Sequence, residues 1–467
     1  MGGPVSPSDG TGHLHHSHGH QSVRHIEVMT PRPAKIATLG LLLAVAAATI
    51  FGLVALWPNG DAVATMVDRG TAITGGFTTA RGEVLSVRDE CADPATAGGG
   101  AAAATESGAP TREIACQTLR IGVLSGSDTG RLIEIEVVGA LATAGITAGD
   151  TVELVATVAP ALAPDAPSAG AGGQGPAESP TGPLSDTHTR YAVSGVERTL
   201  PLALFGLLFA IVVIAVGRLR GALALAALAV SALVLGYFVL PGLVAGGPGL
   251  LIGLVGSVAI MFVTLFFVHG PNMRTAAALI GTLFGIAFVS GFSLLAVATT
   301  RLSGVGDEAS GMLAGLASEI DLRGLLTCSI LIAGLGVLND ITIAQASSVW
   351  ELRSAAPHLS RRELYARAMR IGRDHIASTV YTVVFAYVGA ALSVLLVLFL
   401  IDAPVLSLLT REDFAIEIVR TLTGSVGLVL AVPVTTAVAA WFVPSRSVPR
   451  PPDGRNPLEG VAHSREA

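Results

Sequence analysis

The sequence predicts an all-α polytopic membrane bundle of about eight spans, with a small extracytoplasmic all-β domain inserted between spans 1 and 2. Three observations support this fold class. The 467 residues are 51% hydrophobic and only 13% charged, whereas soluble proteins carry about 25% charged residues. Apolar runs long enough to cross a bilayer recur along the chain. The segment 58–198 instead contains runs of alternating hydrophobicity, which are typical of strands.

The predicted spans are apolar segments of helical length, and the first is an uncleaved anchor rather than a signal peptide because seven more follow it. They cover residues 36–57, 199–217, 221–240, 247–268, 274–299, 324–346, 376–401 and 418–442. Arginine and lysine gather in alternate short loops. The positive-inside rule therefore places both the N- and the C-terminus in the cytoplasm.

The remaining segments complete the predicted domain organisation. Residues 1–35 and 443–467 are expected to be disordered cytoplasmic tails, and residues 199–442 a seven-span membrane domain. Within 58–198, β-rich runs predict a small barrel or sandwich. Two Gly/Ala/Pro-rich stretches, 94–110 and 162–182, are expected to be disordered loops.

Cysteines and histidines suggest two further features. Cys91 and Cys116 flank the first loop of the external domain, where an oxidising compartment would favour a disulfide between them. Imidazoles in the N-terminal tail could collect a divalent metal, although such a tail lacks the fixed geometry of a folded site. The alternative is low-complexity sequence with incidental metal affinity. The histidines are His13, His15, His16, His18 and His20.

The strongest functional candidate is Asp340, which follows Asn339 inside an apolar span (GVLNDITIAQASSVWELR, 336–353). A carboxylate at that depth costs roughly 2.5–3.5 kcal/mol on insertion scales. At helical spacing, Gly336, Asn339/Asp340, Ile343 and Ser347 form one stripe of mostly small and polar groups. We expect this stripe to face other helices, because lipid cannot satisfy it. The alternative role for Asp340 is purely structural hydrogen bonding.

A second polar face opens the next span. Residues 360–375 form a basic amphipathic segment, which predicts a helix along the membrane surface. His375, Thr379 and Thr382 then share one helical face. If that face meets Asp340, its hydroxyls and imidazole could form a proton relay. The alternative is that His375 lies at the interface as a helix-start residue.

Two local patterns predict packing and capping. Gly281 and Gly285 have the GxxxG spacing of closely packed helices. Asn272, in a predicted cytoplasmic turn, is expected to cap the helix that follows it.

Several function classes are not expected. The sequence has no nucleophile–base arrangement, HExxH pair or phosphate-binding glycine loop, so we expect neither an enzyme nor a bound cofactor. No basic stripe carries interleaved aromatic residues, so we expect no nucleic-acid partner. The expected environment is the lipid bilayer.

The two strings GVLNDITIAQASSVWELR and RIGRDHIASTVYTVVFAY (370–387) resemble bacterial YibE/YibF-like membrane proteins, over residues of about 199 to 442. This resemblance implies a multi-pass protein of the bacterial cell membrane and names no substrate. The chain is also similar, more weakly, to SecF and RND-type permeases, in which an Asp in the corresponding span takes part in proton coupling. That implies a proton role for Asp340, with Asn339 beside it.

The chain departs from the permease pattern in having about eight spans, no second copy of the motif and no lysine partner. A lone half would need to form a homo-oligomer or work with a second membrane protein. We therefore carry three hypotheses. The first is a permease or exporter component coupled to protons through Asp340. The second is a scaffold whose external domain binds an envelope partner. The third is a metal transporter fed by the His-rich tail.

Overall fold

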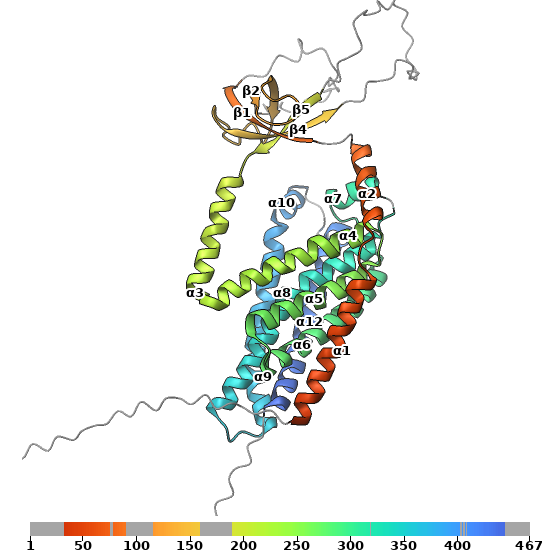
Figure 1. Ribbon diagram of the computed structural model, residues 1–467, viewed down its shortest axis with the longest axis vertical. Coiled ribbons are helices and arrows are strands. Elements are labelled where there is room, and N and C mark those ends of the chain that lie inside the picture. The colour runs from red at the N-terminus through yellow and green to blue at the C-terminus, as the bar shows by residue number, and fades with distance from the viewer. Residues whose placement is uncertain are drawn as a thin grey trace, which may run out of the picture.

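The computed structural model describes residues 32–74, 78–89, 115–158, 189–317, 319–401, 404, 407 and 409–443. A helical bundle carries a small β domain at one end (Figure 1). The start of α1 and the end of α12 lie at the other end of the bundle. Both the helical bundle and the β domain are as the sequence predicts.

Six helices in the described part are long and apolar enough to cross a membrane, the second of them continuing from α3 through η1 (Leu235–Val239) and α4 (Leu240–Val244). They are α1 (Arg32–Ala55), α3 (Thr199–Val234), α5 (Gly249–His269), α6 (Met273–Thr300), α8 (Leu322–Ala355) and α12 (Glu412–Phe442). The chain is therefore a helical membrane protein.

Two elements differ from the predicted spans. Helix α3 contains a sharp turn at Arg218, whose φ of 53° and ψ of −134° are non-helical, so it joins the predicted second and third spans. Gly221 lies just beyond this turn, and a Cβ there would stand 2.2 Å from the carbonyl oxygen of Val213. Only glycine lets the two halves approach so closely.

Helix α9 (Arg361–Ala390) is continuous through the boundary predicted at residue 375, and α10 (Leu392–Ile401) follows it. The expected surface helix 360–375 is thus the first part of one long helix. A capping box starts it: the Ser360 hydroxyl accepts from the Glu363 amide, and the Glu363 carboxylate accepts from the Ser360 amide. No proline or glycine pair interrupts the sequence between the two parts, so nothing ends the helix there.

The β domain is one antiparallel sheet with the strand order β3-β2-β1-β4-β5. The edge strands β3 and β5 lie close to each other, as in the partly open five-stranded barrels of the OB type. Alternate residues such as Val84, Ile121 and Leu154 fill its core. The strands are β1 (Thr78–Arg88), β2 (Cys116–Val123), β3 (Leu132–Val138), β4 (Thr151–Val158) and β5 (Thr189–Val196).

Helix α2 (Gly60–Thr74) precedes the sheet inside the segment predicted to be all-β. Pro58 and Asn59 separate it from α1, and the Asn59 side chain accepts a hydrogen bond from the Asp61 amide at 3.0 Å. The helix packs against α4 and against α7 (Glu308–Leu316), and in the loop after α7 Glu319 pairs with Arg69 at 2.8 Å. The all-β description of residues 58–198 therefore needs this correction.

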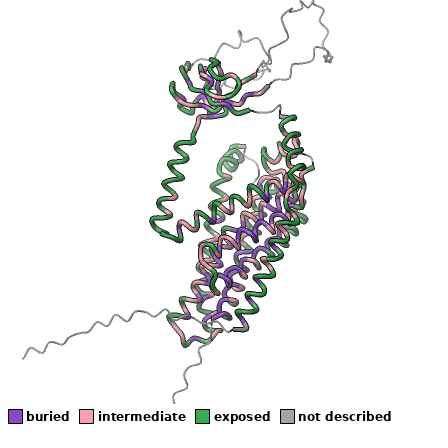
Figure 2. Tube along the Cα trace, viewed as in Figure 1, coloured by how far each residue is buried: buried purple, intermediate pink, exposed green. Residues whose placement is uncertain are grey.

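The core of the bundle lies between α5, α6, α8 and α12, where buried residues concentrate (Figure 2). Glycines allow the close approach. A Cβ at Gly281 would stand 1.8 Å from Thr435 Oγ1, and one at Gly285 would stand 2.6 Å from Leu338. The predicted packing role of these two glycines is confirmed. Asn272 also caps α6 as predicted, accepting from the Thr275 amide at 2.9 Å.

Candidate functional site

Helix α8 has one face that the other helices of the described chain leave largely uncovered. Gly336 and Asp340 are exposed on it, and Ile343 and Ser347 are only partly buried. Ser329 and Ala333 extend the same face toward the other end of the helix, because these positions recur at three- and four-residue steps. We call this the open face of α8. It runs roughly 16 Å from Ser329 to Asp340, at about 1.5 Å per residue.

The helices that the polar stripe is expected to face do not come from the described part of this chain. The remaining sides of α8 are occupied by α5, α6, α12 and α9. Gly249 of α5 meets Gly324, Thr282 of α6 bonds Thr342, and Ile376 of α9 packs against the cluster around Ile341. Four neighbours leave one side free, and the Asp340 side is that one.

Asn339 and Asp340 lie in different surroundings although they are adjacent. The Asn339 side chain is partly buried, and its Oδ1 atom is enclosed without a hydrogen-bond partner among the described residues. Asp340 is exposed. The cost of a carboxylate in hydrocarbon means that Asp340 requires water, headgroups or a polar partner on this side.

The structure does not join the predicted relay. Thr379 donates to the carbonyl oxygen of His375 at 2.8 Å, and Thr382 donates to that of Ser378 at 3.1 Å. Both hydroxyls thus bond within α9. Among the described residues, no hydrogen bond or ion pair links Asp340 to His375, Thr379 or Thr382.

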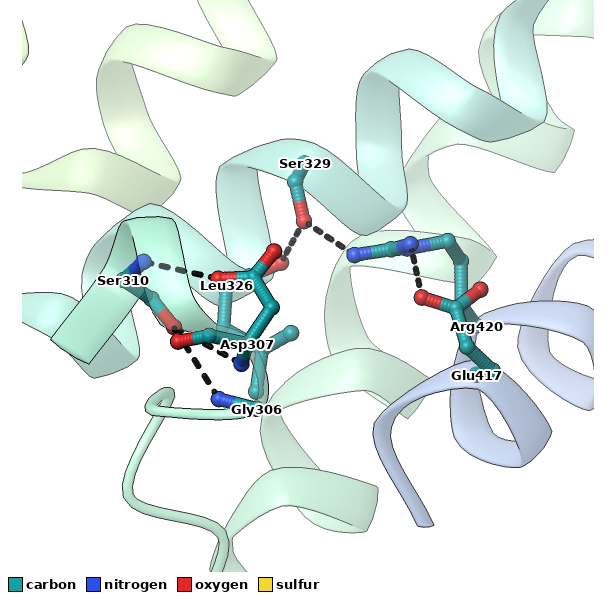
Figure 3. A network of polar contacts seen from close by, with 7 residues as sticks. All are labelled: Gly306, Asp307, Ser310, Leu326, Ser329, Glu417 and Arg420. Carbon is teal, nitrogen blue, oxygen red and sulfur yellow. Dashed lines mark hydrogen bonds and ion pairs between the residues drawn. The ribbon is translucent and has the colours of Figure 1, made fainter. Parts of the chain in front are cut away.

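A polar cluster that the sequence analysis missed lies near the other end of the open face (Figure 3). Arg420 of α12 pairs with Glu417 one turn earlier at 2.5 Å, and its second terminal nitrogen donates to Ser329 Oγ at 3.3 Å. The side chains of Arg420 and Glu417 are 22% and 35% exposed. The pair therefore tethers α12 to the open face of α8 while remaining accessible.

A loop between α6 and α7 completes the cluster. Asp307 begins α7 with a capping box, accepting from the Ser310 amide at 2.7 Å. Hydrogen bonding to the Ser310 side chain and then to its amide holds the pKa of Asp307 below its ordinary value, and the positive charge of Arg420 lowers the pKa further. Asp307 is therefore negatively charged across the neutral pH range, and it lies close enough to Arg420 for the two charges to interact.

Several clefts surround this cluster. One of about 300 Å³ lies between the α6–α7 loop, α8 and α12, with Asp307, Ser329 and Arg420 in its wall. Another of about 500 Å³ is lined by η1 and α4 on one side and by Ser329, Ile332 and Ala333 of α8 on the other. The second cleft therefore continues along the open face in the direction of Gly336 and Asp340.

A Glu-x-x-Arg pair at the start of an apolar helix is the signal that would have revealed the cluster. The predicted last span begins at residue 418, between Glu417 and Arg420. A boundary drawn there assigns the acid to a loop and leaves the arginine unpartnered. In the structure α12 begins at Glu412, so both residues lie on one helix, three positions apart.

Other predicted site residues fall outside the described part of the chain. His13, His15, His16, His18 and His20 lie outside the described residues. Within the described ranges, no group of three or more His, Cys, Asp or Glu residues could hold a metal ion. Cys116 is disulfide-bonded, whereas Cys91 lies outside the described residues, so their pairing stays a prediction.

Comparison with known proteins identifies one family. The model of the family described as YibE/F-like protein matches residues 205–445, which is more than half of the chain and includes the open face of α8 and the Arg420 cluster. No curated protein and no solved structure matches the chain. The weaker similarity to SecF and RND-type permeases therefore receives no support from these comparisons.

Proposed function

The chain belongs to the family of YibE/F-like proteins, and on this premise we propose that it is a permease or exporter component coupled to protons through Asp340. The observation that carries the proposal is the open face of α8. It places a carboxylate inside a membrane-spanning helix on the same accessible side as the cleft that reaches Arg420. Ionisable residues in spans that face a cavity commonly belong to ion or solute pathways.

The proposed topology has eight spans, a β domain outside the cytoplasmic membrane of a bacterium and both termini inside. Two features support it. The turn at Arg218 divides α3 into two segments, and α9 with α10 covers the predicted seventh span. The start of α1 and the end of α12 also lie at the end of the bundle opposite the β domain (Figure 1). In this orientation the Arg420 cluster is at the outer end of the open face.

We further propose that another protein surface or a water-filled space covers Asp340. A second copy of the chain or a second membrane protein could supply it, because Gly336, Ala333 and Ser347 make the open face shallow enough for a helix to approach. The same observation favours the second candidate function, a scaffold without transport. In a scaffold, Asp340 would serve only as a hydrogen-bonding group at a subunit contact.

Carbodiimide labelling tests the proton role without knowledge of the substrate. These reagents modify protonated carboxyl groups in apolar surroundings, and peptide mass spectrometry locates the product. We expect Asp340 of the protein in lipid nanodiscs to be labelled, with labelling that decreases as the pH rises. Glu351, nearer the end of the same helix and exposed, is the matched acid. If Asp340 stays unlabelled at every pH at which Glu351 reacts, proton coupling through Asp340 is wrong and the scaffold function is preferred.

A further inference from the structure

Four clefts of about 250 to 500 Å³ meet at three side chains. Glu417, Arg420 and Tyr387 each line three of these four clefts. They come from α12 and α9, and the α6–α7 loop closes one side. We call this junction the outer pocket. Its polar groups stand at the centre, and its clefts extend outward from them.

The charge at the centre of the outer pocket is negative. Arg420 is the one cation among the lining residues, and Glu417 already neutralises it. Asp307 and Asp413 are two further lining carboxylates. Asp413 bonds Arg411 at 3.1 Å, so even with that arginine included the acids exceed the cations by one. A ligand that enters the pocket meets this excess negative charge.

The walls of the outer pocket are apolar and aromatic. Ala390, Ala391 and Val394 stand opposite Phe414 in the cleft of about 360 Å³. A neighbouring cleft of about 250 Å³ adds aliphatic side chains of α9, α10 and α12, and Tyr387 lies at the edge of both. Aromatic faces attract cations, and quaternary ammonium groups are a common case.

We propose that the outer pocket binds an amphipathic organic cation, with its positive centre between Glu417 and Asp307 and its apolar body along Phe414 and the α9 wall. The chemistry argues against a phosphate-bearing ligand, which would meet three carboxylates and one arginine that is already paired. The inference rests on the proposed permease function, for which it names the substrate class. It leaves the direction of transport open.

The test is a binding measurement with two probes of opposite charge and similar shape. Hexyltrimethylammonium and hexanesulfonate are titrated separately into the purified protein in lipid nanodiscs, and the heat from protein-free nanodiscs is subtracted. We expect saturable binding of the cation with an affinity at least about tenfold above that of the anion. Equal binding of both probes, or no saturable binding of the cation, overturns the proposal.

Two variants locate the binding. Glu417→Gln combined with Asp307→Asn removes two charges at nearly constant shape, and asparagine still caps α7. We expect this variant to bind the cation at least about tenfold more weakly. Glu308→Gln is the matched control, because this acid follows Asp307 but does not line the pocket. Cation affinity that falls as much in Glu308→Gln indicates general surface attraction and contradicts a site at Glu417.

Asp307→Asn alone gives the answer if the double variant does not fold. A single charge loss should then weaken cation binding and leave the anion unchanged, and an unchanged cation affinity overturns the proposal. Asp340→Asn separates this inference from the proposed function. It should retain cation binding, because Asp340 lies roughly 16 Å along α8 from Ser329. If the cation binds but the labelling of Asp340 does not depend on pH, the proposed cation site stands and proton coupling through Asp340 is wrong.

Discussion

The buried and open faces of α8 carry polar residues of similar kinds in opposite settings. On the buried face, Thr342 shares a 2.7 Å hydrogen bond with Thr282, and Gln345 donates to Thr436 at 2.8 Å and to the Ala368 carbonyl at 3.0 Å. On the open face, Asp340 is exposed and has no hydrogen-bond or ion-pair partner among the described residues. Two positions along the chain separate Thr342 from Asp340.

This difference shows how one membrane helix can pack against its neighbours on one face and leave a polar group accessible on the other. Polar groups that make hydrogen bonds within the chain hold α8 to three neighbours, which is the usual role of such groups between membrane helices. Polar groups left unsatisfied by the chain require something from outside it. We therefore expect substitutions on the buried face to change stability and substitutions on the open face to change function.

The largest effect on stability should follow Gly249→Ala. A Cβ at Gly249 would stand 2.3 Å from the backbone carbonyl of Gly324, and backbone cannot move aside as a side chain can. We expect the free energy of unfolding in detergent to fall by about 3 kcal/mol, at the upper end of overpacking costs. Gly336→Ala is the control, since nothing lies within 4 Å of a Cβ there. Equal loss in both variants would abolish the distinction between the two faces.

Gln345→Ala should have the next largest effect. The side chain is fully buried and joins α8 to α9 and α12. Its removal leaves a cavity and takes away the hydrogen bonds that the Ala368 carbonyl and the Thr436 hydroxyl accept, which together cost about 2 kcal/mol. Thermal unfolding would measure the loss against Ser347→Ala on the open face, which should remain close to the wild type. An unchanged melting temperature for Gln345→Ala would show that these contacts contribute little.

A smaller effect should appear in acid at the outer end of the open face. Hydrogen bonding to the Ser310 side chain and to its amide lowers the pKa of Asp307 from its ordinary value of 3.8. The capping interaction therefore contributes fully above that value and is lost as the pH falls through the lowered pKa. We expect the start of α7 to lose up to about 1 kcal/mol of protection, measured by hydrogen exchange. Asp307→Asn cannot titrate, so a similar loss in that variant would assign the effect to another group.

The smallest effect on stability should come from Asp340→Asn. The residue is exposed and makes no contact that the change would remove, so the unfolding free energy should stay within about 0.5 kcal/mol of the wild type. The same variant should lose the carbodiimide reaction at this position. A large loss of stability would mean that Asp340 has a structural partner, as the scaffold function requires.

The sequence predicts more of the fold than of the site. Spacing and hydropathy identify the long apolar helices, the packing role of Gly281 and the cap at Asn272, because each depends on residues close together in the chain. Helical periodicity also predicts that Gly336, Asp340 and Ser347 share a face. It cannot say what lies opposite, since that depends on how many helices surround α8. The prediction therefore places these residues on one face, and the described part of the chain does not supply the helices expected to cover it.

Strand β5 and the Glu417–Arg420 pair were not identified from the sequence, in each case because of the residues next to it in the chain. Strand β5 (Thr189–Val196) contains Ser194 and Gly195, and it follows a Gly/Pro-rich segment that masks its alternation. The Glu417–Arg420 pair was divided by a span boundary placed at residue 418. Charged residues near a membrane surface move such a boundary inward, because hydropathy alone cannot distinguish a paired charge inside a helix from a solvated one beyond its end.

The turn at Arg218 makes the first half of α3 an arm supported only at its ends. Residues from Thr199 to the turn are largely exposed, with β5 before them and the turn after them (Figures 1 and 2). Beyond the turn, the chain continues to η1 and α4, which line one wall of the cleft beside α8. The arm therefore connects the β domain, through the turn at Arg218, to the segment that lines this cleft.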